Sequence, residues 1–185
     1  LERRFTLDVT RPVIVLSPAD GSHHRGEVRP EASPSDLNLD AASLVVTLNG
    51  EPFVSGSAVT AEDAYLLAAS VRDRAGNEGA ASVRFTIDLT APAIDIQGVE
   101  DGEITSRNVI PVVTFSDLHL ASSEILLNGS PFSSGSVVSG EDDYRLEAQG
   151  SDRAGNTATA DVRFAIDRTA PVVKISGIAG PYVCS

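Results

Sequence analysis

The fold of this chain is decided by a turn, Asp73-Arg74-Ala75-Gly76-Asn77, and by the strand-like segment after it, Val83-Arg84-Phe85-Thr86-Ile87. Both recur 79 residues later, at 152–156 and 162–166. Asp and Asn side chains bond nearby backbone and Gly accepts positive φ, so the first segment predicts a tight turn. Alternating apolar and polar residues predict a strand with one buried face. A chain that repeats a turn and a strand at fixed spacing is an array of like modules.

The repeat extends well beyond these two motifs. Residues 46–92 align with residues 125–171 at a constant offset of 79, and 28 of the 47 positions are identical. Each copy ends in Thr-Ala-Pro, at 90–92 and at 169–171. We therefore expect a chain cut from a longer array. Its expected parts are the last strand of a preceding repeat at 1–11, domains at 12–91 and 92–170, and the start of a further repeat at 171–185.

Each copy contains about seven short strands, which we expect to be antiparallel. In the first copy the opening strand is expected at 14–16 and a less distinct second strand at 28–34, where Pro30 indicates an edge or a bulge. Asn49-Gly50 predicts a hairpin, and the clearest strand begins at Tyr65. No segment has helical periodicity. The predicted fold class is all-β: tandem immunoglobulin-like β-sandwich domains in an extended end-to-end array.

Tyr65 and Tyr144 stand at the head of the penultimate strand, where sandwiches of this type have a tyrosine corner. The succession of Thr-Ala-Pro, Leu-Asn-Gly-x-Pro-Phe, Glu-Asp-x-Tyr-x-Leu, Asp-x-Ala-Gly-Asn and Phe-x-Ile-Asp resembles the tandem bacterial immunoglobulin-like repeats of large secreted or cell-surface proteins. The resemblance covers the whole chain. It implies an extracellular, non-catalytic spacer or stalk that supports adhesion or display of a functional head, with calcium between the modules in some members.

Composition limits the partners. The chain has 14 Lys and Arg residues against 26 Asp and Glu residues, a net charge of −12. Nucleic acids and anionic membranes bind clustered cations, so neither is an expected partner. No apolar run reaches about 18 residues, which argues against direct membrane insertion. The single cysteine, Cys184, permits no internal disulfide, and its role stays open.

Acidic residues beside the linkers are candidate calcium ligands. In this topology the loop after the second strand and the last hairpin turn lie at the end where the chain enters a sandwich, beside the linker aspartate. Calcium binds about six to eight oxygens from carboxylates and carbonyls. No cofactor is required, but calcium would suit Asp8, Asp36, Asp73 and Asn77 in the first domain, and Asp88, Asp117, Asp152 and Asn156 in the second. Three further acids are expected near Asp88, namely Asp20, Glu62 and Asp63.

The alternative is that the turn residues bond only to their own backbone, with the linker aspartates exposed as solvated strand ends. The three histidines, His23, His24 and His119, lie outside the shared positions and are expected to be exposed loop residues.

Catalysis is not expected, because the chain has no nucleophile elbow and no phosphate-cradling glycine motif. The repeated carboxylate pairs, Glu62-Asp63 and Glu141-Asp142, head a strand and are expected to be exposed. The main rival function is a glycan-binding or protein-binding adhesin module. Sugar sites use exposed aromatic rings, and Phe53 and Phe132 are the only repeated aromatics not assigned to the core. We expect them to pack under their own hairpins.

Overall fold

The structure is a computed structural model that describes residues 7–174 and Ser176. This part of the chain is entirely β-structure and turns, as predicted. It contains no helix long and apolar enough to span a membrane. Spatial proximity groups the residues into two compact units. The first unit comprises residues up to Ile94 with Phe115–Ser123 and Gln149–Thr159, and the second comprises Asp95–Thr114, Glu124–Ala148 and the residues from Ala160.

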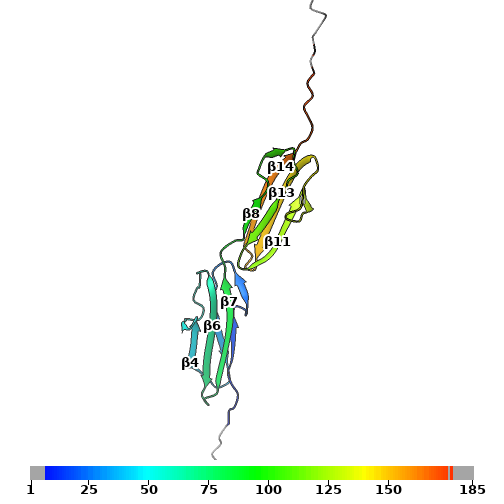
Figure 1. Cartoon of the computed structure of the whole chain (residues 1–185). Helices are drawn as coiled ribbons and strands as arrows, with labels where there is room; N and C mark the ends of the chain where they lie inside the picture. The colour runs from blue at the N-terminus through cyan, green and yellow to red at the C-terminus, as the bar shows by residue number, and fades with distance from the viewer. Residues whose placement is uncertain (1–6, 175, 177–185) are drawn as a thin grey trace, which may run out of the picture. The chain divides into compact units, whose positions relative to one another are not determined.

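Each repeat folds into seven strands in two sheets (Figure 1). The first repeat contains β1 (Val13–Ser17), β2 (Ser22–His24), β3 (Glu31–Ser35), β4 (Leu39–Leu48), β5 (Glu51–Pro52), β6 (Asp63–Asp73) and β7 (Glu78–Ile87). One sheet has the order β2-β7-β6-β4-β5, and the other pairs β1 with β3.

The second repeat contains the equivalent strands β8 (Ala93–Gln97), β9 (Glu103–Thr105), β10 (Val112–Ser116), β11 (Leu120–Leu127), β12 (Ser130–Pro131), β13 (Asp142–Asp152) and β14 (Thr157–Ile166). Its sheets have the orders β12-β11-β13-β14-β9 and β10-β8. The two repeats thus share one sheet topology. The extended end-to-end arrangement remains a prediction.

The core of the first sandwich forms where β6 pairs with β7. Alternate residues of β6 point inward, and Leu67 and Ile87 are 0% exposed. Phe85 packs in the same cluster. Burying one such side chain is worth about 1.5–3 kcal/mol relative to leaving it in water. Leu146 and Ile166 take the equivalent positions in the second sandwich and are just as deeply buried.

Both predicted tyrosine corners are present. The Tyr65 hydroxyl donates a hydrogen bond to the carbonyl of Ala61 at 2.9 Å, and that of Tyr144 donates to the carbonyl of Gly140 at 3.1 Å. Each bond reaches four residues back along the chain. It ties the loop before the long strand to the head of that strand.

The expectation that all strands are antiparallel was wrong. β2 pairs with β7, and β9 with β14, in parallel. After β1 the chain crosses from the small sheet to the large one and runs alongside the last strand in the same direction. The segment is only three residues long, and Ser22-His23-His24 lacks the apolar alternation that would have marked it as a strand.

The second strand begins later than its predicted range of 28–34. β3 starts at Glu31, because Pro30 has no N–H to donate to a ladder. Val28 instead forms one isolated bridge with Val59. At the outer edge of β3 the Ser55 hydroxyl accepts the hydrogen bond of the Ala32 amide at 2.9 Å. A side chain thus replaces a strand at this edge.

The two cores differ at two matched positions, and the smaller residue at one position accompanies a larger residue at the other. Val71 of β6 corresponds to Gly150 of β13, and Pro34 of β3 corresponds to Phe115 of β10. A Cβ atom on Gly150 would lie 3.1 Å from the Phe115 ring. The second sandwich therefore uses the absent side chain as room for an aromatic ring.

We expect Gly150→Val to destabilise the second sandwich by about 1–3 kcal/mol through overpacking against Phe115. Combining it with Phe115→Ala should recover part of that loss, because the added methyl groups then enter the vacated space. Urea unfolding of the two single variants and the double variant measures the coupling. Strictly additive losses would mean that the two positions do not share the space.

Candidate metal centre

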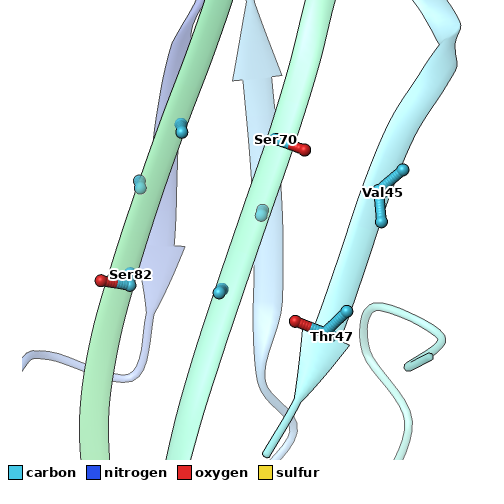
Figure 2. Close-up of a pocket in the computed structure, with 8 residues that line it drawn as sticks. Val45, Thr47, Ser70 and Ser82 are labelled. Carbon is cyan, nitrogen blue, oxygen red and sulfur yellow. The ribbon is translucent and has the colours of Figure 1, made fainter. Parts of the chain in front are cut away.

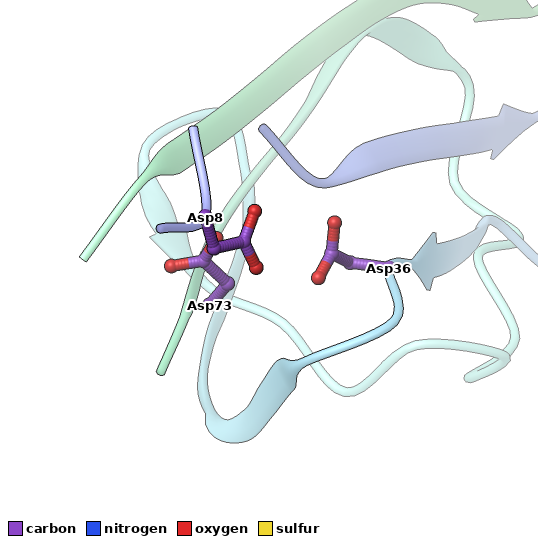
Figure 3. Close-up of side chains that lie close together, drawn as sticks. All are labelled: Asp8, Asp36 and Asp73. Carbon is purple, nitrogen blue, oxygen red and sulfur yellow. The ribbon is translucent and has the colours of Figure 1, made fainter. Parts of the chain in front are cut away.

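Three of the predicted aspartates meet at one end of the first sandwich. Asp8 comes from the segment before β1, Asp36 follows β3 and Asp73 ends β6. Each offers a carboxylate oxygen, and these oxygens all lie within 4.8 Å of one another. Figure 3 shows the three carboxylates gathered between the chain segments that carry them. We call this group the first aspartate cluster.

The second aspartate cluster repeats this arrangement. Asp88, Asp117 and Asp152 again bring carboxylate oxygens within 4.8 Å of one another, and all three belong to the first compact unit. Asp88 and Asp152 are each 4% exposed, and Asp73 in the first cluster is 3% exposed. Carboxylates this deeply buried need partners, because burying an uncompensated charge is costly.

Part of that compensation comes from the loops themselves. Asp36 accepts the backbone N–H of Asn38 at 2.7 Å. Asp73 accepts the backbone N–H of Asn77 at 2.8 Å and its side-chain N–H at 2.6 Å. The bonding of turn residues to their own turn, considered above as the alternative, is therefore present. It does not exclude a metal, since each carboxylate has about four lone-pair sites.

Asn77 and Asn156 act as donors. Besides bonding its own turn, Asn77 Nδ2 donates to the backbone carbonyl of Asp8 at 3.1 Å, and Asn156 Nδ2 donates to that of Asp88 at 2.8 Å. Each amide thus connects a linker to the last hairpin turn of the sandwich that follows. Only the amide oxygen is left for a metal, so direct coordination by these two residues stays a prediction.

The buried turn aspartates are ionised at neutral pH. For Asp73 the largest single effect on the pKa is burial, which raises it. The hydrogen bonds from the Asn77 side chain and from the Asn77, Gly76 and Ala75 amides together outweigh burial and leave the pKa below its ordinary value. The pKa of Asp152 is lowered in the same way, with burial opposing the donors of its own turn.

Two carboxylates at this separation repel each other by about 3 kcal/mol at an effective dielectric constant near 20. Besides Asn77 and Asn156, one further side chain in each cluster contacts the linker aspartate and relieves part of this repulsion. In the first cluster Asn38 Nδ2 donates to Asp8 at 2.7 Å, and in the second His119 Nδ1 lies 2.8 Å from Asp88 Oδ2. Among the described residues no arginine or lysine forms a salt bridge with the six aspartates. The donor set suits a hard divalent cation that accepts several carboxylates and completes its shell with carbonyl oxygens or water.

Sequence reasoning missed the position that His119 shares with Asn38. Both residues follow the loop aspartate by two, and both side chains contact the linker aspartate. The prediction that the histidines are exposed was wrong, since all three are partly buried. His24, for example, lies edge-on to Phe85, with ring centroids 6.3 Å apart.

The other acids expected near Asp88 have different partners. Asp20 accepts the Arg84 amide at 2.7 Å, and Asp63 accepts the amide of its neighbour Ala64 at 2.8 Å. Glu62 contacts the linker at Thr90. Within the described range none of the three belongs to a metal-competent group.

An open depression of 540 Å³ lies elsewhere, on the outer face of β4, β6 and β7 (Figure 2). Its lining is uncharged, with Val45, Thr47, Ser70 and Ser82 among its residues. The matching face of the second sandwich is charged and includes Arg145, which forms salt bridges with Glu147 and Asp161. This depression is one of several open depressions on the described part of the chain, and others are of similar volume.

Solved structures share this architecture. The four-domain structure of Sidekick-1 immunoglobulin domains 1–4 matches with a TM-score of 0.51 at 13% identity, over 88% of this chain and 51% of that one. The fold is immunoglobulin-like. The predicted resemblance is confirmed at the level of fold.

Two further matches have lower scores. Titin domains I67–I69 match with a TM-score of 0.48 at 11% identity, over 86% of this chain and 66% of that one. Fibronectin(III)-like modules of CbhA from Clostridium thermocellum match with a TM-score of 0.43 at 11% identity, over 88% of this chain and 100% of that one. No protein-family model and no curated protein sequence matches the immunoglobulin-like chain.

Proposed function

We propose that this chain is a non-catalytic spacer of tandem immunoglobulin-like domains in a bacterial surface or secreted protein. In this role it works outside the cell, beside like repeats, and supports adhesion or the display of a functional head. The supporting observation is which residues the two copies share. The 28 identical positions among residues 46–92 and 125–171 include most of the buried core residues, the last turn and the Thr-Ala-Pro linker. A spacer needs a self-contained core and a uniform joint, which are the parts that repeat.

The residues that differ also favour a spacer. Ala68 and Ser82 on the outer sheet face correspond to Glu147 and Asp161, so the copies keep their cores but not this surface. A ligand site present on every module would require the same surface chemistry in both copies. The remaining alternative is an adhesin site on the first domain alone, in the uncharged depression that includes Val45.

A screen of glycans and extracellular-matrix proteins separates these functions. For a spacer we expect no saturable binding. Saturable binding that is lost in Val45→Glu and in Ser82→Asp, which copy the second repeat, would establish the adhesin function and overturn the spacer. Asp161→Ser, the reverse change on the second domain, is the matched control.

We expect Phe53→Ala and Phe132→Ala to lower stability by about 2 kcal/mol each, less than a fully buried phenylalanine would lose. Phe53 is partly buried against the first core, under its hairpin. Thermal unfolding measures the loss, and the screen should be unchanged in both variants. A binding loss without a stability loss would identify these rings as a ligand platform.

We further propose that calcium binds both aspartate clusters and orders the linkers. The support is the repeated convergence of three carboxylates within 4.8 Å, each trio drawn from a linker, a loop and a turn. A bound ion would join the linker aspartate to the sandwich that follows it. Six aspartates would supply the charge: Asp8, Asp36, Asp73, Asp88, Asp117 and Asp152.

A further inference from the structure

Two repeated motifs that lie far apart in the sequence meet in each domain. The first is the glutamate of the Glu-Asp pair before the corner tyrosine, and the second is the threonine of Thr-Ala-Pro. Thr90 Oγ1 donates to the Glu62 carboxylate, with both carboxylate oxygens at 3.0 Å. In the second domain Thr169 Oγ1 donates to Glu141 Oε1 at 2.5 Å. Both pairs are separated by 28 residues, so the contact recurs with the repeat.

We propose that each Glu–Thr pair is an exit clamp, which holds the first linker residues against the sandwich they leave and so limits the flexibility of the linker. This inference deepens the proposed spacer function and rests on it for its purpose, because a spacer transmits distance only through stiff joints. The glutamates are positioning residues. They act on the linker threonine and not on a ligand.

The clamp completes a set of bonds along each linker. The Asp88 amide donates to the His24 carbonyl at 2.9 Å, and the Thr90 amide donates to Asp88 Oδ1 at 3.1 Å. Besides its bond with Thr90, the Glu62 carboxylate accepts a hydrogen bond from the Leu89 amide at 3.3 Å. Pro92 then fixes its own φ and restricts the residue before it. Of these contacts, only those of Glu62 join the Leu89-Thr90 segment to the β5–β6 loop.

The second linker has the same backbone bonds. The Asp167 amide donates to the Thr105 carbonyl at 2.9 Å, and the Thr169 amide donates to Asp167 Oδ1 at 2.9 Å. The exit clamp between Glu141 and Thr169 is thus built on an identical local frame. Within the described residues the second linker contributes to neither aspartate cluster, so it tests the clamp away from both of them.

The pKa of Glu141 is consistent with a carboxylate that accepts the hydrogen bonds of the clamp. The Thr169 hydroxyl first, and the Arg168 backbone N–H second, hold the pKa of Glu141 below its ordinary value. Asp167 is the titratable side chain that faces Glu141 from the linker. A lowered pKa means that the clamp is fully formed above about pH 4.3 and is lost as the pH falls through the lowered pKa.

Trypsin tests the clamp, because the Arg168–Thr169 bond is a tryptic site inside it. At neutral pH we expect Glu141→Ala to speed initial cleavage at this bond by about fivefold or more, since cleavage follows local opening. Asp142→Asn changes the neighbouring carboxylate, and in this variant trypsin should cleave the Arg168–Thr169 bond at the wild-type rate. Mass spectrometry quantifies this bond alone, and thermal unfolding checks that both variants remain folded. An unchanged cleavage rate in folded Glu141→Ala would overturn the proposal.

Two NMR measurements extend the test to both copies. Thr169→Val should raise the pKa of Glu141 toward its ordinary value, because it removes the largest of the lowering hydrogen bonds, whereas Thr169→Ser, which keeps the hydroxyl, should leave the pKa low. Glu62→Ala should raise amide exchange at Leu89 by about tenfold, with Asp63→Asn as the control. A glycan or protein hit in the screen would refute the spacer and leave these results intact. An unaltered Glu141 pKa in Thr169→Val would refute the clamp and leave the spacer intact.

Discussion

Saturating calcium should raise the melting temperature of this chain by about 10–20 °C, and EDTA should reverse the rise. An ion at about one hundred times its Kd stabilises the native state by about 2.7 kcal/mol per site. For a domain of this size each kcal/mol corresponds to about 4–8 °C. The gain comes from replacing carboxylate repulsion by coordination, since each cluster holds three aspartates within 4.8 Å.

Asp117→Asn makes this prediction specific to one cluster. In EDTA the variant should be more stable than the wild type, because a neutral amide removes repulsion from Asp88 and Asp152 and can still accept the His119 amide. In calcium the order should invert, because the variant has lost a ligand. Asp95→Asn removes a charge from an exposed strand position and should show neither effect.

Isothermal titration calorimetry checks the stoichiometry. We expect two calcium ions per wild-type chain, one in Asp117→Asn and one in Asp36→Asn, its counterpart in the first cluster. If the wild type and both variants melt at the same temperature with and without calcium, calcium does not bind these aspartates under the conditions tested. The two clusters would then serve only as hydrogen-bonded anchors for the linkers.

The sequence was sufficient for the fold because the long strands carry strong alternation. Leu67 and Leu146 each lie in a long strand in which every second residue is buried, a pattern that local chemistry makes visible. The parallel pairing of β2 could not be predicted, because its three residues have no alternation and the partner strand lies about 60 residues away in the chain. Pro30 indicated the irregular second strand but not the residue at which it would begin.

The candidate site was predictable where chain topology decided it. A linker, a loop and a turn that reach the same end of a sandwich bring Asp88, Asp117 and Asp152 together, whatever their side-chain geometry. Geometry within the site was not predictable in this way. Glu62 was expected near the metal group, but the Thr90 hydroxyl is its partner. His119 was set aside because it differs from Asn38, although both contact the linker aspartate.

Leu67→Ala should destabilise the first sandwich by about 3–5 kcal/mol and leave the stability of the second unchanged. Leu67 is fully buried beside Phe85 and Ile87, and truncating such a leucine costs about 3–5 kcal/mol. A domain of about 80 residues has only about 4–12 kcal/mol of stability. The loss therefore removes a large part of the stability of one domain. It should not affect a core that Leu67 does not touch.

Leu146→Ala is the matched variant, because this leucine takes the same place in the second core and is equally buried. Hydrogen exchange read by mass spectrometry, in EDTA so that metal does not couple the domains, should show lost protection in β6 and β7 for Leu67→Ala. For Leu146→Ala the loss should move to β13 and β14. Each sandwich closes around its own leucine, so the two patterns should be complementary. Loss of protection in all four strands in either variant would mean that the repeats share one cooperative core, and the independent modules that a spacer requires would not exist.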